Sequence, residues 1–428
     1  MRAFFFLPHL EVSGGLGVHC RMLLEALCGA GDLELVVAVT DQPGLLFPKS
    51  GIEGINEILK TWGNRLRLVR VDWPLGRSLA LPLDDLLGSM IQTAFPDKTN
   101  SGSATTAPDL CLSSYYTGFI DPPCPQIVVW HDSGFLEHPE RFGDAAKIRL
   151  ETHAKILPRL DTLLCISEDS RDRFVERGLV PLEKTRVIWH CLTDIDPNIP
   201  FEPSHHSAQT AKNLPLYQAG PTIAELGDFW FSPVGAATGF NRSRKNLPVL
   251  VNGMRKWAEE RKKEGNYTPV RLLVASTGVL DEQMIADLLP HGERGTLQKG
   301  CWISEDGALV LLPNLQRQRF LDCMAASKGV VYPSRHEGFG LPIIEAMAFG
   351  LPVIAARATS IPEVAGNAAI LVDPDDGFGM AREMARLSND PNASARLGIL
   401  GRERTRTHFT IARAQSELIL LFKDLIKS

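Results

Sequence analysis

The chain lacks the cysteine spacing, the charge excess and the long apolar runs that mark several classes of protein. Its eight cysteines over 428 residues include no Cys-x-x-Cys pair, which indicates neither a zinc site nor a disulfide framework. Reduced thiols in a cytoplasmic protein are therefore expected. A net charge of -5 argues against a general nucleic-acid binder. No apolar run approaches the roughly 20 residues of a membrane-spanning helix, and the apolar start Met1–Leu7 is too short for a signal peptide.

The composition that is present is that of a globular protein, with 44% hydrophobic and 22% charged residues. The length suffices for two domains that each bury a core. Short apolar runs alternate with helical patterns, which predicts parallel sheets with crossover helices. The expected strands are Ala3–Leu7, Leu33–Val39, Leu110–Ser113, Ile127–Trp130, Thr162–Ile166, Arg186–Trp189, Phe229–Val234, Val270–Ala275, Ala308–Leu312, Val330–Tyr332 and Val353–Ala355.

The most informative stretch is a Gly-Phe-Gly turn with a glutamate on either side, Glu337 and Glu345. It follows the expected strand Val330–Tyr332, and Pro342 suits the first turn of a helix, so the order is strand, turn, helix. The helix start favours a phosphate through the free amides expected at Leu341, Ile343 and Ile344. Glu345 lies one turn in, within reach of hydroxyl groups beside that phosphate. Phosphate, polyol and a second carboxylate in one place indicate a nucleotide-sugar site.

A second glycine-rich turn, Ser13 to Gly17, follows the first expected strand. Its glycines let a ligand approach the backbone, and the helix expected over Arg21–Leu27 attracts negative charge at its start. A dinucleotide-binding turn is an alternative, with Asp41 ending the second strand. Cys20, however, stands where that fingerprint has its third glycine.

Three cations, Arg242, Arg244 and Lys245, precede a helix expected from Leu247, and Arg244 and Lys245 are the two favoured for a role in binding. Positive charges at a helix start oppose its dipole unless an anion lies among them. A diphosphate would meet that need through charge-assisted hydrogen bonds. A solvated basic turn is the alternative.

Two polar residues, His131 and Asp132, end the expected strand Ile127–Trp130. The carboxyl ends of strands in open α/β sheets face the ligand crevice. His131 is therefore expected to hold a sugar hydroxyl, while Asp132 caps the turn. The alternative is a pair that only orients its loop.

Together these segments resemble the retaining glycosyltransferases of family four, over nearly the whole chain. Glu337 to Glu345 is similar to the family's two glutamates separated by seven residues, and Arg244-Lys245-Asn246 to its basic diphosphate motif. The neighbourhood of His131 is similar to bacterial mannosyltransferases of the family. His190-Cys191-Leu192 departs from the asparagine-glycine turn that many members have at that position.

The resemblance implies the GT-B fold, an α/β architecture of two doubly wound, Rossmann-like domains that face a cleft. We expect an acceptor-side domain over residues 1–195, a polar linker over 196–220 and a nucleotide-sugar-binding domain over 221–410. A C-terminal helix over 411–428 is expected to pack back on the protein body. A membrane-binding amphipathic helix is the alternative for that segment.

The resemblance also implies a metal-independent, retaining transfer of a hexose in polysaccharide biosynthesis. The nucleotide sugar is a substrate, and no cofactor is expected; the neighbourhood of His131 favours GDP-mannose. The acceptor would be a saccharide or a lipid-linked saccharide, reached in the cytoplasm or at the inner face of the membrane. Glu337 and His131 would be catalytic. The implied donor-binding residues are Gly14, Gly15, Arg244, Lys245, Gly338, Phe339, Gly340, Leu341, Ile343 and Glu345.

Three other functions stay open at this point. One is a sugar-nucleotide epimerase on the same fold. Another is a subunit that binds a nucleotide sugar without catalysis. The third is a nicotinamide dehydrogenase that uses Gly15 and Asp41.

Overall fold

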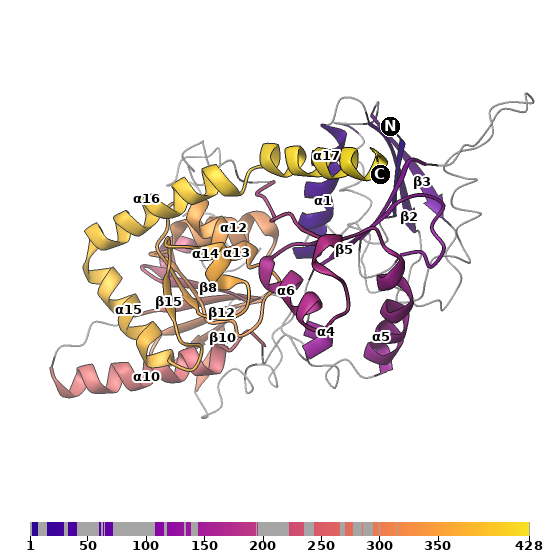
Figure 1. Ribbon diagram of the computed structural model, residues 1–428. Coiled ribbons are helices and arrows are strands. Elements are labelled where there is room, and N and C mark those ends of the chain that lie inside the picture. The colour runs from indigo at the N-terminus through magenta and orange to yellow at the C-terminus, as the bar shows by residue number, and fades with distance from the viewer. Residues whose placement is uncertain are drawn as a thin grey trace, which may run out of the picture. The chain divides into compact units, whose positions relative to one another are not determined.

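The chain divides into two compact units, Met1–Thr193 with Phe409–Ser428 (unit 1) and Asp194–His408 (unit 2). Each has its own sheet in the computed structural model (Figure 1). The structure describes residues 2–6, 15–29, 33–40, 60, 63, 65–71, 108–114, 118–131, 134–137, 144–193, 195, 222–234, 244–265, 270–276, 285, 294–298, 300–313 and 315–427. The expected linker, 196–220, lies outside these ranges.

Unit 1 contains a seven-stranded parallel sheet in the order β3-β2-β1-β4-β5-β6-β7. The six strands expected in the first half of the chain are confirmed to within a residue or two at each end; β3 was not predicted. The bounds are β1 Arg2–Phe6, β2 Glu34–Thr40, β3 Leu66–Val71, β4 Leu110–Ser113, β5 Gln126–Trp130, β6 Thr162–Cys165 and β7 Thr185–Val187.

The helices of unit 1 include α17, the last of the chain, which lies beside α1 (Figure 1). Leu418 and Phe422 of α17 join the same buried core as Leu23 and Leu27 of α1. This apolar face of α17 is therefore occupied by protein. No helix in the described ranges is both long and apolar enough to cross a membrane. The bounds are α1 Gly15–Cys28, α4 Gly134–Glu137, α5 Asp144–Ile156, η2 Leu157–Arg159, α6 Glu168–Glu176, η3 Leu182–Lys184 and α17 Ile411–Lys427.

Unit 2 contains an eight-stranded sheet in the order β10-β11-β12-β9-β8-β13-β14-β15. Its strands are parallel except that β11 pairs antiparallel with both β10 and β12. The five strands expected in the second half of the chain are confirmed, while β10, β11 and β15 were not predicted. The bounds are β8 Trp230–Val234, β9 Leu272–Ser276, β10 Gly295–Gln298, β11 Cys301–Ser304, β12 Leu309–Leu312, β13 Val330–Tyr332, β14 Val353–Ala356 and β15 Ile370–Val372.

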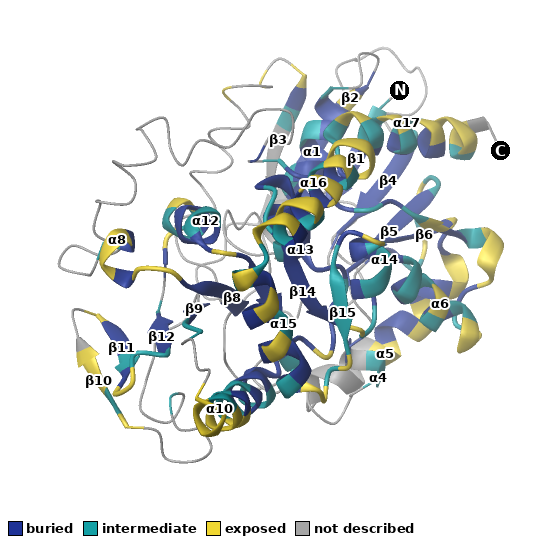
Figure 2. Ribbon diagram, turned by 90° about the vertical axis from the view of Figure 1, so that its left-hand side faces the viewer, coloured by how far each residue is buried: buried dark blue, intermediate teal, exposed yellow. Residues whose placement is uncertain are grey.

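The strands β8 and β14 are buried throughout, whereas α10 and α15 each turn an exposed face outward (Figure 2). Buried parallel strands covered by helices with one exposed face are typical of a doubly wound domain. The predicted α/β fold class is confirmed in both units. The helices are α8 Ile223–Leu226, α10 Leu247–Lys263, α12 Arg317–Ala326, α13 Leu341–Ala348, α14 Ile361–Ala365, α15 Gly377–Asn389 and α16 Pro391–His408.

Candidate functional site

The strand order of unit 2 identifies where a ligand would bind. From β8 the chain adds β9 and β12 on one side, and then β13, β14 and β15 on the other. The neighbours β8 and β13 therefore form the switch point of the sheet, and ligands of such sheets bind at the carboxyl ends of the strands there. Lys245 follows β8 and Glu337 follows β13.

Lys245 and Glu337 form a buried ion pair at this switch point. The Lys245 Nζ donates to Glu337 Oε1 at 2.7 Å, and the two residues are 8% and 7% exposed. The second carboxylate oxygen lies 4.0 Å from an Arg244 guanidinium nitrogen. Tyr332 accepts a further hydrogen bond from Lys245 at 3.1 Å, and the Ser334 hydroxyl donates to Glu337 Oε1. The sequence-predicted pair of cations and the predicted carboxylate thus lie together.

The charges of this cluster set its protonation. Burial alone would raise the pKa of Glu337, but Lys245, Arg244 and the hydrogen bonds to its carboxylate lower that pKa to about 2. Burial lowers the pKa of Lys245, and the Glu337 carboxylate opposes that change. Burial, followed by the charge of Glu337, raises the pKa of Tyr332 well above its usual value. Glu337 is consequently an ionised carboxylate at neutral pH and Tyr332 is a neutral phenol.

The turn that begins α13 is fixed by the segment after β14. The Ser360 hydroxyl donates to the carbonyls of Glu337 and Phe339 at 2.9 and 3.1 Å. The Glu337 N–H donates to Thr359 Oγ1 at 3.0 Å. Thr359 has φ 45°, an uncommon backbone conformation for a β-branched residue, so the structure around the turn holds it under strain.

The glycine turn itself occupies the place that the sequence predicted, with one correction. Gly340 precedes α13 at φ 103°, a conformation that favours glycine, and Gly338 and Leu341 flank the turn. The N–H of Ile343, however, donates to the Gly340 carbonyl at 2.9 Å. The free amide expected at Ile343 is therefore wrong for this structure, because the first turn of the helix is closed by this shorter-range bond.

Glu345 forms an ion pair that the sequence did not reveal. Arg317 donates to Glu345 Oε1 at 2.6 Å, and Glu345 is 3% exposed. Arg317 begins α12, shortly after the carboxyl end of β12. A basic residue after an apolar strand was the available signal for it.

Asn246 anchors the basic turn to two neighbouring segments. It adopts φ 55°, which asparagine tolerates better than most residues. Its side-chain amide donates to the carbonyls of Pro333 and Pro374 at 3.0 and 2.7 Å. Arg335 in turn donates to Asn246 Oδ1 at 3.0 Å. These bonds hold Lys245 beside the segment after β13.

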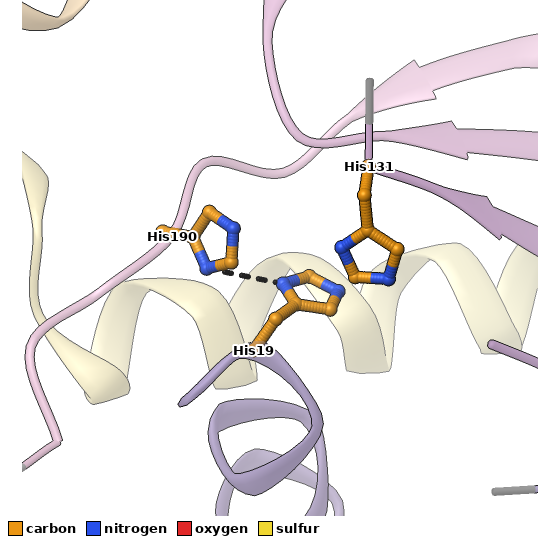
Figure 3. A group of neighbouring side chains, drawn as sticks. All are labelled: His19, His131 and His190. Atoms are coloured by element: carbon orange, nitrogen blue, oxygen red, sulfur yellow. Dashed lines mark hydrogen bonds between the residues drawn. The ribbon is translucent and has the colours of Figure 1, made fainter. Parts of the chain in front are cut away.

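The candidate site residues of unit 1 are described by themselves. Gly15 is the first residue of α1, while Gly14, Asp41 and Asp132 lie outside the described ranges. His131 follows β5 and is buried with His19 and His190 (Figure 3). Nδ1 of His19 is 3.1 Å from Nδ1 of His190, and the His19 and His131 ring centroids are 4.6 Å apart.

The comparisons with known proteins extend these observations. Residues 234–390 match the family model described as glycosyl transferases group 1, and this range contains all the unit 2 site residues from Arg244 to Glu345. The comparison with curated proteins gives no match.

Three solved structures illustrate the fold. Sucrose-phosphate synthase from Thermosynechococcus elongatus has 19% identity and a TM-score of 0.64, covering 100% of this chain and 99% of its own. The Anabaena protein HepE with UDP-glucose has 16% identity and a TM-score of 0.64, covering 99% and 100%. WaaG, a glycosyltransferase of lipopolysaccharide biosynthesis, has 12% identity and a TM-score of 0.60, covering 97% and 98%. These likenesses confirm the GT-B fold.

Proposed function

We propose that the protein is a retaining glycosyltransferase that moves a hexose from a nucleoside diphosphate sugar to a saccharide or lipid-linked saccharide. The observation that carries the proposal is the buried Lys245–Glu337 ion pair at the switch point between β8 and β13. It lies within the segment that matches glycosyl transferases group 1. Buried ion pairs at the carboxyl ends of such strands are typical of a ligand-binding site.

Lys245 and Arg244 would bind the diphosphate. As the bond between the sugar and the phosphate breaks, negative charge grows on the leaving diphosphate, and fixed cations stabilise it without reorganising. No metal is needed at the diphosphate, because these side chains and the start of α13 supply the positive potential. Lys245 is already positioned to bind the diphosphate, because its ion pair with Glu337 fixes its side chain.

Glu337 would face the donor sugar as a carboxylate. Its pKa of about 2 keeps it ionised, so it suits stabilisation of positive charge on the sugar and does not suit the role of a general acid. The acceptor hydroxyl attacks the anomeric carbon from the face that the phosphate leaves, and its proton passes to the leaving diphosphate. This sequence retains the anomeric configuration.

Glu345 would bind the ribose hydroxyl groups, and Arg317 would position it. The 2.6 Å bond from Arg317 fixes one carboxylate oxygen of Glu345. In unit 1, we propose that His131 contacts the donor sugar. Gly14 and Gly15 would lie beside the diphosphate, because the start of α1 favours an anion.

The donor and the setting are the finer parts of the proposal. The neighbourhood of His131 resembles mannosyltransferases and favours GDP-mannose, whereas the HepE structure contains UDP-glucose, which makes that compound the second candidate. We place the reaction in the cytoplasm, at the inner face of the membrane where the acceptor is lipid-linked. Polysaccharide biosynthesis is the process that this acceptor class suggests.

A donor panel tests the proposal. Nucleotide release and product formation are measured with GDP-mannose, UDP-glucose and related donors, and NMR reads the anomeric configuration of the product. Glu337→Gln and Lys245→Gln are each expected to lower transfer by about 100-fold or more, the usual cost of losing one group that stabilises developing charge. Lys328→Ala is the matched control, because Lys328 is an exposed cation of unit 2.

Each rival function has its own outcome. An epimerase would convert the donor into a new sugar nucleotide without any acceptor. A non-catalytic subunit would show a donor-dependent rise in melting temperature and no transfer. Full transfer by both site variants, with unchanged melting curves, would contradict the roles given to Lys245 and Glu337.

A further inference from the structure

Three buried histidines lie together at the carboxyl edge of the unit 1 sheet (Figure 3). His19 is on α1, which follows β1; His131 follows β5; and His190 follows β7. One ring nitrogen from each residue can be chosen so that all three lie within 4.8 Å of one another. The residues are 1%, 8% and 2% exposed. Three separate elements of unit 1 thus converge on one set of nitrogen donors.

The surroundings of this histidine cluster are unusual for a purely structural role. No cysteine or carboxylate of the described residues joins the group. Nδ1 of His19 shares a hydrogen bond with Nδ1 of His190 at 3.1 Å, whereas the buried Nε2 of His19 makes no hydrogen bond to a described residue. Buried polar atoms are normally satisfied, so such an atom calls for an explanation.

We propose that His19, His131 and His190 form a binding site for a divalent transition-metal ion, and that Zn²⁺ is the ion that fits it. Imidazole nitrogens suit zinc and its neighbours, whereas Mg²⁺ and Ca²⁺ prefer oxygen donors. Nitrogen ligands about 2.0–2.1 Å from a tetrahedral zinc lie about 3.3 Å apart. The 3.1 Å between the His19 and His190 nitrogens is close to that separation.

Burial also affects the protonation of two of these histidines. Burial, followed by the charges of His190 and His131, lowers the pKa of His19 well below its usual value. Burial, followed by His131, lowers the pKa of His190 in the same way. Both changes favour the neutral imidazole of His19 and of His190.

Zinc held by three histidines keeps a fourth position open, as in catalytic zinc sites. The site is in unit 1, outside the range 234–390 that matches glycosyl transferases group 1, so it does not depend on the proposed transfer activity. Metal ligation and direct contact with a sugar would compete for the His131 imidazole. Metal binding measured without any donor separates the two roles.

The test uses full-length protein without a polyhistidine tag, stripped of metal with a chelator. Titration with Co²⁺, which substitutes for zinc and absorbs visibly when bound in a tetrahedral site, is expected to saturate at one ion per chain. Competition with Zn²⁺ should abolish the absorption, and Mg²⁺ should have no effect. Zn²⁺ should also raise the melting temperature of the wild-type protein.

The variants His190→Asn and His19→Asn are expected to weaken Co²⁺ binding by at least about 100-fold, since even loss of a supporting group around a metal ligand costs 10–100-fold. Asparagine keeps a hydrogen-bonding side chain, so a purely structural cluster would tolerate the change. His408→Asn is the control, because His408 is an exposed histidine of unit 2. Absence of tetrahedral Co²⁺ absorption in wild-type protein, or equal binding by wild type and His190→Asn, would overturn the proposal.

Discussion

At the scale of single residues, the Lys245–Glu337 ion pair makes the free energy of unfolding depend on pH. The folded pKa of Glu337 is about 2, below its usual value of 4.5. A carboxyl group with a lowered pKa stabilises the fold fully above the unfolded pKa, and that contribution is lost as the pH falls through the folded pKa. A shift of this size corresponds to a free energy on the order of 3 kcal/mol.

The prediction compares wild type with Glu337→Gln in urea unfolding between pH 6 and pH 3. Wild type should be more stable at pH 6, and its advantage should shrink on acidification, because below a pH of about 4.5 the unfolded chain takes up a proton at Glu337 that the folded protein does not. Differences between the two proteins cancel the titration of the other carboxyl groups. An advantage that stays constant over this range would show that Glu337 is not held as a paired carboxylate.

The sequence could predict some of these residues and not others. Glu337 and Lys245 follow apolar strands, and parallel strands end at the same edge of a sheet. The proximity of these two residues could therefore be predicted from the sequence. Arg317 also follows an apolar strand, β12, but its contact with Glu345 could not be predicted, because that contact depends on how α12 and α13 lie on the sheet. The strained backbone of Thr359 could not be predicted either, because β-branched residues rarely adopt a φ of 45° and the sequence has no pattern that indicates it.

At the scale of elements, α10 and α15 approach closely at two glycines. A Cβ on Gly253 would lie 2.0 Å from the backbone of Gly377, and one on Gly377 would lie 2.0 Å from the Val249 carbonyl oxygen. Gly253→Ala should destabilise unit 2 by about 2 kcal/mol, because overpacking against backbone outweighs the better helix propensity of alanine. Urea unfolding measures the change.

Lys256→Ala on the exposed face of the same helix is the control for Gly253→Ala. Surface substitutions of this kind usually change stability by less than about 0.5 kcal/mol. Equal stability of Gly253→Ala and wild type would mean that α10 and α15 can separate at no cost.

Most of the strands that the sequence predicted are buried; the edge strand β7 is an exception, since it contains one buried, one exposed and one half-buried residue. The strands β4, β8, β13 and β14 are buried throughout and read as continuous apolar runs. The four missed strands lie at or next to sheet edges. Arginines interrupt β3, β15 is only half-buried, and the β10–β11 hairpin exposes 69% of Leu297. Edge strands need less apolar sequence, so their signal is weak.

At the scale of the whole molecule, the chain leaves unit 1, builds unit 2 and returns with α17 to the first core. Such a path brings residues together that are far apart in sequence. His19, His131 and His190 converge only because α1 and the segments after β5 and β7 reach the same edge of one sheet. No local spacing in the sequence predicts this histidine cluster, whereas a cysteine-based zinc site would have been recognised as a sequence motif.

Two cores with different ligands should respond separately to those ligands. Calorimetry of the metal-free protein is expected to show two transitions. Leu418→Ala, in the unit 1 core, should lower one transition, and Gly253→Ala, in unit 2, should lower the other. Zn²⁺ should then raise only the transition that Leu418→Ala lowers. The donor's nucleoside diphosphate, which Lys245 and Glu345 of unit 2 would bind, should raise mainly the transition that Gly253→Ala lowers. A ligand at a hundred times its Kd contributes about 2.7 kcal/mol, enough to resolve the shift. If both ligands moved both transitions equally, the two cores would unfold as one, and neither site could be assigned to its own unit in this way.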